Sequence, residues 1–459
     1  MSVNAGARLD RLPMSRFHRR ILWLIGVGMF FDGFDIYVAS TVLGATLHSG
    51  FATLPQTALF VSMTFVGMTI GSLGTGFLGD HFGRRFSYQM NLMVFGVASL
   101  AAALAPNMAF LIVCRFVMGV GLGAENVVGY STLTEFVPPQ ARGRQQGIMT
   151  VFVVTGLPVS ALVGLALVPS LTWRVMFVLG GIGAIAVWYV RKQLPESPRW
   201  LEATGRGDEA EALLRTIEAE VSAERGPLPA ISSTPAVAFS RSLDSLFAPA
   251  MLRRLVLGCV LLIVINTLIY GFITWLPTFF VKQGMTIAKS FGFAFAMSLG
   301  APVGSAIGAL GSDRWGRKPM IIVASAAAIA VGAIYPFVVD PVLLVGCGVA
   351  LVIPIYVLVA LLFGIYVPEL FPTEVRLRAS GICNTLGRAA TIGTPFLVVW
   401  LFGEHGVTGV LVFMIALLVV QIAAVAGWGL ETRGRTLEDV AAAATPPRLP
   451  LATDVSGRL

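Results

Sequence analysis

The sequence predicts an all-α membrane protein with twelve transmembrane helices in two pseudo-symmetric six-helix bundles. The first observation is composition: 56% of the 459 residues are hydrophobic and only 12% are charged, whereas soluble domains carry about 25% charged residues. The second is a series of apolar segments of roughly the ~20 residues that cross a bilayer core. The third is a set of polar motifs that occurs once in each half of the chain.

Twelve apolar segments can be drawn along the chain, each close in length to a membrane-crossing helix. They cover residues 21–47, 57–79, 86–105, 108–137, 147–168, 173–190, 255–281, 291–310, 320–339, 342–370, 381–402 and 409–428.

The Lys and Arg residues lie almost entirely on one side of these segments. Of the 32, Arg115 and Arg388 fall within spans and Arg174, Lys282 and Lys289 on the far side, which leaves 27 on the side of both termini. Cytoplasmic loops carry such an excess. We therefore expect a multi-pass protein of a bacterial inner membrane with both termini cytoplasmic, and the net charge of +8 requires no nucleic-acid partner.

Polar segments divide the chain into five parts. We expect a cytoplasmic tail at 1–20, a six-helix bundle at 21–192, a cytoplasmic linker at 193–252, a second bundle at 253–429 and a tail at 430–459. In the linker, Ala212, Leu213, Ile217 and Val221 recur at helical spacing among charged residues. This pattern predicts an amphipathic helix against the cytoplasmic face.

The loops contain an internal repeat. Asp80, Gly83 and Arg84 recur at an offset of 233 residues, and a second set recurs at 234, with a weaker pair at 235. The matched residues are Asp313, Gly316 and Arg317 in the first case; Glu135, Pro138, Arg142, Arg144 and Gly147 with Glu369, Pro372, Arg376, Arg378 and Gly381 in the second; and Glu196-Ser197 with Glu431-Thr432 in the third. Three matches in one order indicate a duplicated half, an arrangement found in one large class of transporters.

These loop motifs resemble those of the major facilitator superfamily, and the resemblance covers essentially the whole chain. Residues 79–85 and 312–318 look like its signature loop, and 115–125, 194–200, 368–381 and 430–439 are similar to motifs of its sugar-porter-like branch. Residues 32–35 (DGFD) resemble a signature of the aromatic acid:proton symporters, and 270–277 a segment of metabolite and nicotinate-type importers. The resemblance implies the major facilitator fold and a proton-coupled importer of a small metabolite, which we expect to be a monomer.

The likeness departs from the sugar porters in the seventh span. Residues 265–270 lack the glutamine-rich pattern that binds sugar in that branch. The resemblance therefore implies an organic acid, such as an aromatic acid, rather than a hexose. Two alternatives stay open: a proton-driven efflux antiporter and a sugar or polyol:proton symporter.

Ionisable residues at bilayer depth are functional candidates because each costs at least ~2.5 kcal/mol there. With a rise of ~1.5 Å per residue, Asp35 in the first span and Arg115 in the fourth lie at nearly the same level. The resemblance implies that these two spans are neighbours across the central cavity, so we expect Asp35 and Arg115 to pair. All four histidines fall outside the predicted spans. We therefore expect Asp32, Asp35 and Glu125 to couple the proton; fixed ion pairs that orient helices are the alternative.

A second group is predicted to bind the substrate. Arg388 lies near the midplane of the eleventh span, and its planar guanidinium suits bidentate carboxylate binding. The other candidates are Arg115, Asn266, Tyr270, Trp275 and Asn384. Ordinary packing is the alternative for the uncharged side chains.

The repeated loop residues are predicted to gate. Asp80 is expected to cap a helix N-terminus, and Arg84 to pair with Glu135 or a neighbouring acid; Asp313, Arg317 and Glu369 would repeat this in the second half. Such pairs across the cytoplasmic side would close it in the outward-open state and break as the halves rock, and simple loop anchoring is the alternative. The gating candidates are Asp80, Gly83, Arg84, Glu135, Arg142, Glu196, Arg199, Asp313, Gly316, Arg317, Glu369 and Arg376.

Enzymatic and metal-dependent functions find no support in the sequence. Four cysteines stand singly inside spans, and no grouping of His, Ser, Cys and Asp suggests catalysis. Gly119, Gly121 and Gly123 look like part of a nucleotide-binding loop but lie inside an apolar span, where close helix packing explains them. We expect no cofactor; the partners are a small-molecule substrate, the proton and the lipid bilayer.

Overall fold

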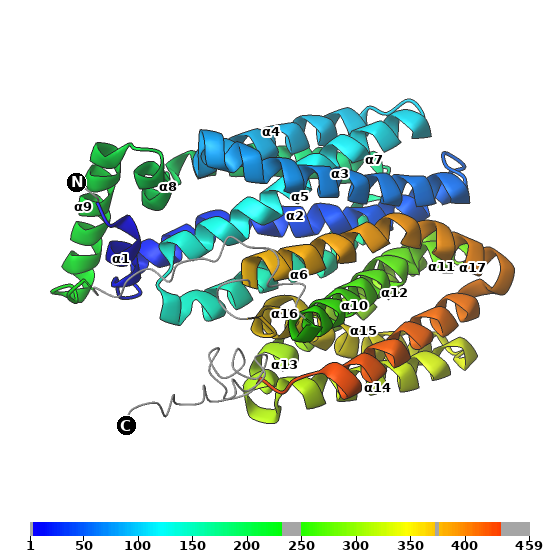
Figure 1. Ribbon diagram of the computed structural model, residues 1–459. Coiled ribbons are helices and arrows are strands. Elements are labelled where there is room, and N and C mark those ends of the chain that lie inside the picture. The colour runs from blue at the N-terminus through cyan, green and yellow to red at the C-terminus, as the bar shows by residue number, and fades with distance from the viewer. Residues whose placement is uncertain (1–2, 232–248, 372–375, 433–459) are drawn as a thin grey trace, which may run out of the picture.

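The computed structural model describes residues 3–231, 249–371 and 376–432, and these residues form helices without any strand (Figure 1). Eleven of the helices are long and apolar enough to cross a membrane. The last of them, α17 (Arg376–Trp428), turns back on itself at Gly406, whose φ is 64°. Because α17 therefore contains two spans, the predicted twelve-span architecture is confirmed.

The first six spans, which we call the N bundle, are long single helices. They are α2 (Arg16–His48), α3 (Leu54–Phe82), α4 (Arg84–Ala103), α5 (Met108–Phe136), α6 (Pro139–Leu167) and α7 (Arg174–Val190), and the turn η1 (Arg191–Gln193) follows α7. α3 packs on α5, α2 on α6, and α4 on both α5 and α7.

The last six spans, which we call the C bundle, are more interrupted. The seventh span consists of α10 (Pro249–Gly271), η3 (Ile273–Trp275) and α11 (Leu276–Lys282); the eighth of α12 (Ile287–Ser298) and α13 (Gly300–Trp315); the ninth of α14 (Arg317–Ile334) and η4 (Tyr335–Phe337); the tenth of α15 (Pro341–Leu361), η5 (Leu362–Tyr366) and α16 (Val367–Glu369). A glycine ends α10 and a proline lies in the first turn of α11, and these residue types interrupt helices.

Glycine packing shows the internal repeat in three dimensions. A Cβ on Gly71 of α3 would lie 1.9 Å from the carbonyl oxygen of Val120, and one on Gly304 of α13 would lie 2.2 Å from that of Ile353. Both residues of the second pair stand 233 positions after those of the first. The glycines of α5 pack in the same way, since a Cβ on Gly123 would lie 2.0 Å from the Met68 carbonyl oxygen, which confirms the helix-packing interpretation.

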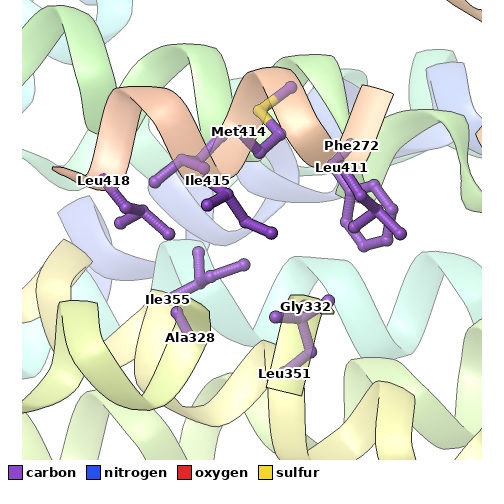
Figure 2. Close-up of a pocket in the computed structure, with 10 residues that line it drawn as sticks. Phe272, Ala328, Gly332, Leu351, Ile355, Leu411, Met414, Ile415 and Leu418 are labelled. Carbon is purple, nitrogen blue, oxygen red and sulfur yellow. The ribbon is translucent and has the colours of Figure 1, made fainter. Parts of the chain in front are cut away.

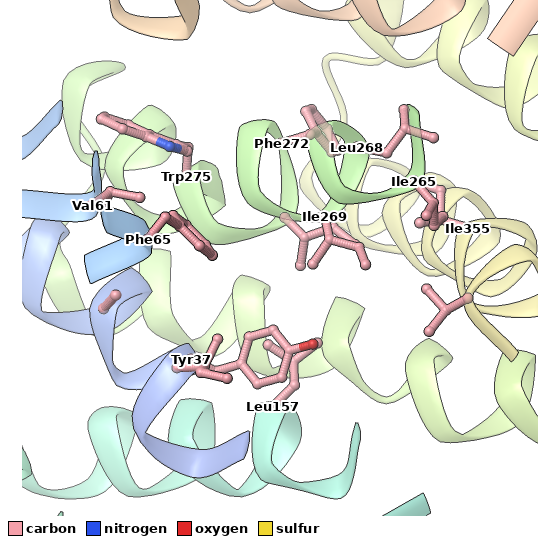
Figure 3. Close-up of a cluster of buried hydrophobic side chains, with 14 of the residues drawn as sticks. Tyr37, Val61, Phe65, Leu157, Ile265, Leu268, Ile269, Phe272, Trp275 and Ile355 are labelled. Atoms are coloured by element: carbon pink, nitrogen blue, oxygen red, sulfur yellow. The ribbon is translucent and has the colours of Figure 1, made fainter. Parts of the chain in front are cut away.

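The two bundles meet through α3 with α17, α6 with α12, and α2 with α11. The Tyr356 hydroxyl donates to that of Tyr37 over 3.0 Å, and Ser62 Oγ donates to the Ile392 carbonyl over 2.8 Å. Figure 3 shows aromatic and aliphatic side chains from both bundles gathered at this contact, with Phe65 beside the seventh span. These contacts lie toward the end of the molecule remote from the repeated loops, which we call the far end; the other we call the loop end.

Three short helices cover the N bundle at its loop end: α1 (Ala5–Asp10), α8 (Pro198–Ala203) and α9 (Gly207–Arg225). The structure has the predicted linker helix, and its apolar stripe is correct in part. Ile217 and Val221 are buried as expected, but Ala210 and Leu214 complete the buried face, whereas Ala212 is exposed. The stripe differs because α9 packs on α1 and α2 of the protein itself.

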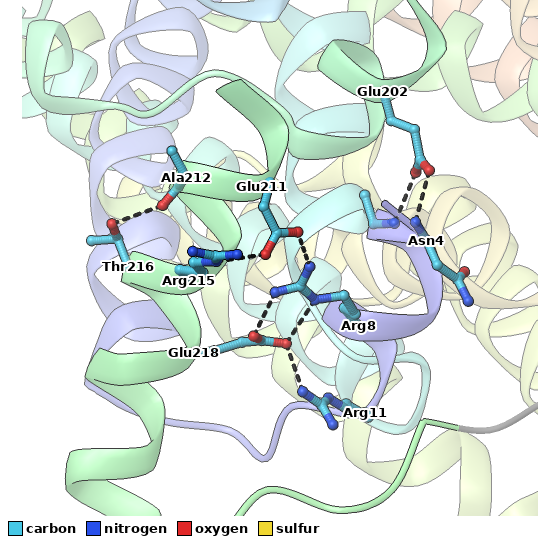
Figure 4. Close-up of polar contacts among 10 residues, drawn as sticks. Asn4, Arg8, Arg11, Glu202, Glu211, Ala212, Arg215, Thr216 and Glu218 are labelled. Carbon is cyan, nitrogen blue, oxygen red and sulfur yellow. Dashed lines mark hydrogen bonds and ion pairs between the residues drawn. The ribbon is translucent and has the colours of Figure 1, made fainter. Parts of the chain in front are cut away.

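Ion pairs fasten α1 to α9 (Figure 4). Arg8 donates to both carboxylate oxygens of Glu218, over 3.0 and 2.7 Å, and also pairs with Glu211. Arg11 donates to Glu218 over 2.7 Å. The hydrogen bonds from Arg8 lower the pKa of Glu218 below its usual value. The N-terminal segment is thus a folded part of the loop end.

Candidate functional site

The ion pair predicted inside the N bundle is present. Arg115 Nη1 donates to Asp35 Oδ2 over 2.5 Å, Nη2 donates to the Asp35 carbonyl oxygen over 3.0 Å, and Nε donates to Thr64 Oγ1 over 3.1 Å. The guanidinium also lies over the Phe60 ring. Arg115 is 1% exposed and Asp35 fully buried. The four groups that face the guanidinium belong to α2 and α3, and Arg115 belongs to α5, so the pair ties the three helices together.

Glu125 has a partner that the sequence analysis missed. Arg191 of η1 is fully buried, forms an ion pair with Glu125, and donates to the carbonyl oxygens of Leu24 and Ile25 over 3.0 and 2.8 Å. Sequence reasoning placed Arg191 in a loop, because it follows the predicted end of the sixth span by one residue. A Cβ on Gly28 would lie 1.8 Å from Arg191 Nη2, so this glycine is required for the arrangement.

Asp32 stands between these two pairs but belongs to neither. It is 2% exposed, and its Oδ2 is buried without a hydrogen-bond partner among the described residues. It lies within electrostatic range of Glu125, Arg191, Asp35 and Arg388. Asp32 is therefore the one member of the predicted proton-coupling set without a direct counter-ion in the described structure.

Arg388 approaches from the C bundle. Its Nη1 is buried without a hydrogen-bond partner in the described part of the chain, and Tyr270, Tyr130 and Asp32 lie within electrostatic range. The preceding Gly387 lets α17 approach α10, since a Cβ there would lie 2.9 Å from Asn266 Nδ2. The structure thus gathers an available cation, an available carboxyl and two tyrosines from both bundles.

The other substrate candidates differ in their surroundings. Tyr270 is half-buried with its ring 4.5 Å from that of Phe65. The amides of Asn266 and Asn384 donate to backbone carbonyls four residues earlier in their own helices. Trp275 is completely buried and stacks on Phe279, so its place is the packed cluster of Figure 3. Tyr130 is a neighbour of Arg388 that we had not singled out.

The repeated loops form the same small structure in each bundle. Gly83 and Gly316 have φ of 94° and 89°, and a carboxylate caps the helix that follows each: Glu196 accepts from the N–H groups of Arg84 and Arg85, and Glu431 from those of Arg317 and Lys318. We had expected an aspartate of the loop to provide such a cap. The weakest of the three sequence matches therefore supplies the capping residue.

The arginines of these loops pair inside each bundle. Arg84 binds Glu135, with Nη2 to Oε1 at 3.0 Å, and Arg317 binds Glu369 through two hydrogen bonds of 3.0 and 3.1 Å. Both pairs were expected from the loop motifs, but each lies within one bundle, whereas the gating hypothesis called for pairs that break as the bundles rock. The turn glycine directs each arginine toward the end of a neighbouring helix in its own bundle.

Of the remaining gating candidates, two contact α1 at the loop end and three have side chains outside the described structure. Arg142 and Arg199 both donate to Asp10 Oδ1 of α1 over 2.7 Å. The side chains of Asp80, Asp313 and Arg376 lie outside the described structure.

One further expectation needs correction. The four histidines were expected in loops or tails, but they lie in helices: His18 and His48 at the two ends of α2, His81 in the last turn of α3, and His405 within α17. His18 is fully buried and caps its own helix with Ser15. All four stay remote from the Asp32 and Arg388 groups along their helices.

A separate small cavity lies inside the C bundle (Figure 2). Side chains of α10, α14, α15 and α17 line it, and all ten are apolar or glycine: Leu268, Phe272, Ala328, Gly332, Leu351, Ile355, Leu411, Met414, Ile415 and Leu418. A cavity without polar groups cannot orient a polar substrate, so it is a packing defect between helices.

Two bundles of six spans with ionisable groups between them define a secondary transporter. The family model described as sugar (and other) transporter matches residues 23–444. The chain is 36% identical to the inner membrane metabolite transport protein YdjE of Escherichia coli, over 95% of this chain and 98% of that one, and 30% identical to the niacin transporter NiaP of Acinetobacter baylyi, over 95% and 99%. A solved structure of the E. coli xylose transporter XylE matches with a TM-score of 0.72 at 17% identity, covering 92% of this chain and 100% of that one.

The chain therefore belongs to the sugar (and other) transporter family, within the major facilitator superfamily. It is a multi-pass membrane transporter and not an enzyme.

Proposed function

We propose that the protein imports a small organic carboxylate, such as an aromatic acid, together with protons across the bacterial inner membrane. The observation that carries the proposal is Arg388, whose buried Nη1 has no partner in the described structure. A guanidinium without a hydrogen-bond partner at membrane depth is costly, and a carboxylate would satisfy it through paired hydrogen bonds. Alternating access moves this site from one side to the other.

An aromatic acid fits the surroundings of Arg388. Tyr270 and Tyr130 lie within electrostatic range of the guanidinium, and Phe65 packs at the edge of Tyr270. Such rings offer flat apolar surface beside the charge. The relative NiaP carries the name of niacin, a small aromatic carboxylic acid, which supports this class of substrate.

The N bundle is proposed to handle the proton through Asp32, Asp35 and Glu125. Both termini are proposed to be cytoplasmic, with bundles at 21–192 and 253–429 and the linker at 193–252. The loop pairs Arg84–Glu135 and Arg317–Glu369 are proposed to stiffen each bundle at its cytoplasmic end while the bundles rock. The protein would act as a monomer.

Thermal stabilisation of the purified protein tests the substrate class, because a ligand raises the apparent Tm in proportion to its binding free energy. The panel contains nicotinate, 4-hydroxybenzoate, gluconate and glucose. We expect a carboxylate to stabilise the wild type and to lose this effect in Arg388→Gln, while Arg253→Gln, the same change at an exposed position, leaves it intact. Stabilisation by glucose alone would instead support the sugar alternative. Extrusion rather than accumulation in energised vesicles would support the antiporter.

A further inference from the structure

We propose that Cys259 and Cys383 are a covalent modification site inside the C bundle, where peroxide converts the two thiols into a reversible disulfide. The bond would fix α10 to α17 and slow transport until a reductant breaks it. The effect on transport rests on the proposed function, whereas formation of the bond and the restraint of the two helices do not.

The structure brings together two cysteines that lie 124 positions apart in the chain. Cys259 Sγ of α10 donates to Cys383 Sγ of α17 over 3.7 Å, and Cys383 Sγ donates to the carbonyl oxygen of Leu255 over 3.7 Å. The other two thiols are placed differently, since Cys347 contacts a backbone carbonyl of α14 and Cys114 lies on α5 in the N bundle. Cys259 and Cys383 are therefore the pair that is placed to react with each other.

The two thiols differ in exposure, which sets the order of the reaction. Cys259 is half-buried, whereas Cys383 is 0% exposed. Hydrogen peroxide, which is small and uncharged, therefore meets Cys259 first: the sulfur attacks the O–O bond, one water leaves, and the thiol becomes a sulfenic acid. The sulfur of Cys383 then attacks the sulfenic sulfur, and the hydroxyl leaves as a second water with the Cys383 proton. Two thiols and one hydrogen peroxide thus give one disulfide and two waters.

Closing this bond requires the helices to move. A disulfide has an S–S distance of about 2.05 Å, so the two sulfurs, now 3.7 Å apart, must approach by about 1.7 Å. A Cβ on Gly258 would lie 2.8 Å from Cys383 Sγ, which shows that the Cys383 side chain already lies against the α10 backbone. Closure therefore draws on a shift of α17 along α10 as well as on side-chain rotation, and a close-packed interior transmits such a shift.

The same contact between α10 and α17 continues to Arg388. Asn266 stands seven residues after Cys259 and Gly387 stands four residues after Cys383, so each lies on the same helix face as its cysteine. Asn266 and Gly387 approach closely, since a Cβ on Gly387 would lie 2.9 Å from Asn266 Nδ2. Arg388 follows Gly387 directly, so a shift at the thiol pair displaces the guanidinium. Sites that depend on orientation are sensitive to displacements of about 1 Å.

The first experiment detects the bond itself. Full-length protein is treated with hydrogen peroxide, unfolded and labelled with a maleimide. We expect four labelled thiols before treatment and two after it, four again after dithiothreitol, and a cross-linked peptide that contains residues 259 and 383. Cys259→Ala should keep its three thiols (four minus one), whereas the control Cys347→Ala should fall from three to one. Four thiols in the treated wild type, or the same loss in Cys259→Ala, would overturn the proposal.

The second experiment reads the restraint without any substrate. Hydrogen exchange is followed in α10 and in the first turns of α17, before and after oxidation. Because a cross-link removes conformations in which two segments separate, we expect exchange there to slow by at least about threefold, in the wild type and in Cys347→Ala but not in Cys383→Ala. Unchanged exchange in fully cross-linked protein would overturn the restraint.

The third experiment measures transport in liposomes with an alkaline interior, with labelled nicotinate as the probe. We expect the initial rate to fall by at least about threefold on oxidation and to recover with dithiothreitol, while the rate of Cys259→Ala does not respond to peroxide. An unchanged rate in fully cross-linked protein would overturn the effect on transport. If the reduced protein took up no nicotinate above the level of protein-free liposomes, the proposed function would fail, and the first two experiments would still decide whether the bond forms and restrains the helices.

Discussion

Two neighbouring aspartates on α2 should respond oppositely when each is replaced by asparagine. Asp35 is fully buried and neutralises Arg115, which is 1% exposed. In Asp35→Asn the guanidinium keeps Thr64 Oγ1 and the carbonyl of residue 35 as acceptors but loses its counter-ion. Removing one partner of a buried pair costs ~3–5 kcal/mol, and the retained hydrogen bonds place this case near the lower value, about 3 kcal/mol.

Asp32 is nearly as buried, yet no described residue provides it with a counter-ion in direct contact. An amide there removes an unpaired charge whose burial is itself unfavourable. We therefore expect Asp32→Asn to change the free energy of unfolding by less than about 1 kcal/mol, or to increase it. The two variants should therefore differ by about 2–3 kcal/mol, and with roughly 2–4 °C per kcal/mol for a unit the size of one bundle their apparent Tm values should differ by about 4–12 °C.

The assay is thermal unfolding in detergent, followed by a thiol-reactive dye that labels the buried Cys114 and Cys383 as they become exposed. A double variant, Asp35→Asn with Arg115→Gln, provides the internal control, because it removes both charges and should recover part of the loss. If Asp32→Asn lowered the apparent Tm as much as Asp35→Asn, Asp32 would have a counter-ion after all. The charge assignment in the N bundle would then be refuted.

Three further changes test other parts of the fold. Gly83→Ala should lower the apparent Tm by more than the control Gly147→Ala. At Gly83 φ is 94° and the new Cβ would lie 2.4 Å from the capping Glu196, whereas nothing lies within 4 Å at Gly147. Equal Tm values for the two variants would contradict the cap. Gly332→Ala should stabilise the protein by about 1 kcal/mol through helix propensity, since its Cβ would meet only ordinary contacts at 3.8 Å. A lower Tm would show that the cavity lined by Gly332 in the C bundle has no room for a methyl group. The ion pairs of Glu218 lower its pKa and stabilise the docking of α1 at pH values above the ordinary glutamate pKa of about 4.3. This stability is lost as the pH falls through the lower pKa of the folded state, so hydrogen exchange of α1 should accelerate there in the wild type but not in Glu218→Gln. The same pH response in both proteins would contradict this assignment.

The sequence predicted those features that are determined within one chain segment or by the depth of a residue along its membrane span. Hydropathy located the spans, and helical rise placed Asp35 and Arg115 at one level. The loop repeat predicted that Gly83 and Gly316 make equivalent turns. Each of these rests on local geometry, which the residue types determine directly.

What the sequence did not predict depends on how helices face one another. Arg191 looked like a loop residue because nothing in the order of residues shows that the chain after α7 turns inward toward Glu125. The contact of Tyr37 with Tyr356 joins residues 319 positions apart and requires the relative placement of the bundles. The first turns of the α9 stripe were misplaced because α1, taken for a tail, packs on α9.

The repeat makes clear that the two bundles share a scaffold but not its charges. At the offset of 233 that relates α5 to α15, Arg115 and Glu125 correspond to Gly348 and Leu358. At the offset of 234 that relates α6 to α17, Arg388 corresponds to Val154. Fixed ion pairs therefore tie together the unbroken helices of the N bundle, whereas the C bundle has interrupted spans and contributes Arg388, whose Nη1 is buried without a hydrogen-bond partner among the described residues. Because Asp32 and Arg388 lie on different bundles, any rocking of the bundles changes the electrostatic interaction between them. With the proposed roles of a proton-binding carboxyl and an anion-binding guanidinium, the affinities for proton and substrate both change with conformation, which is the condition that coupled transport requires.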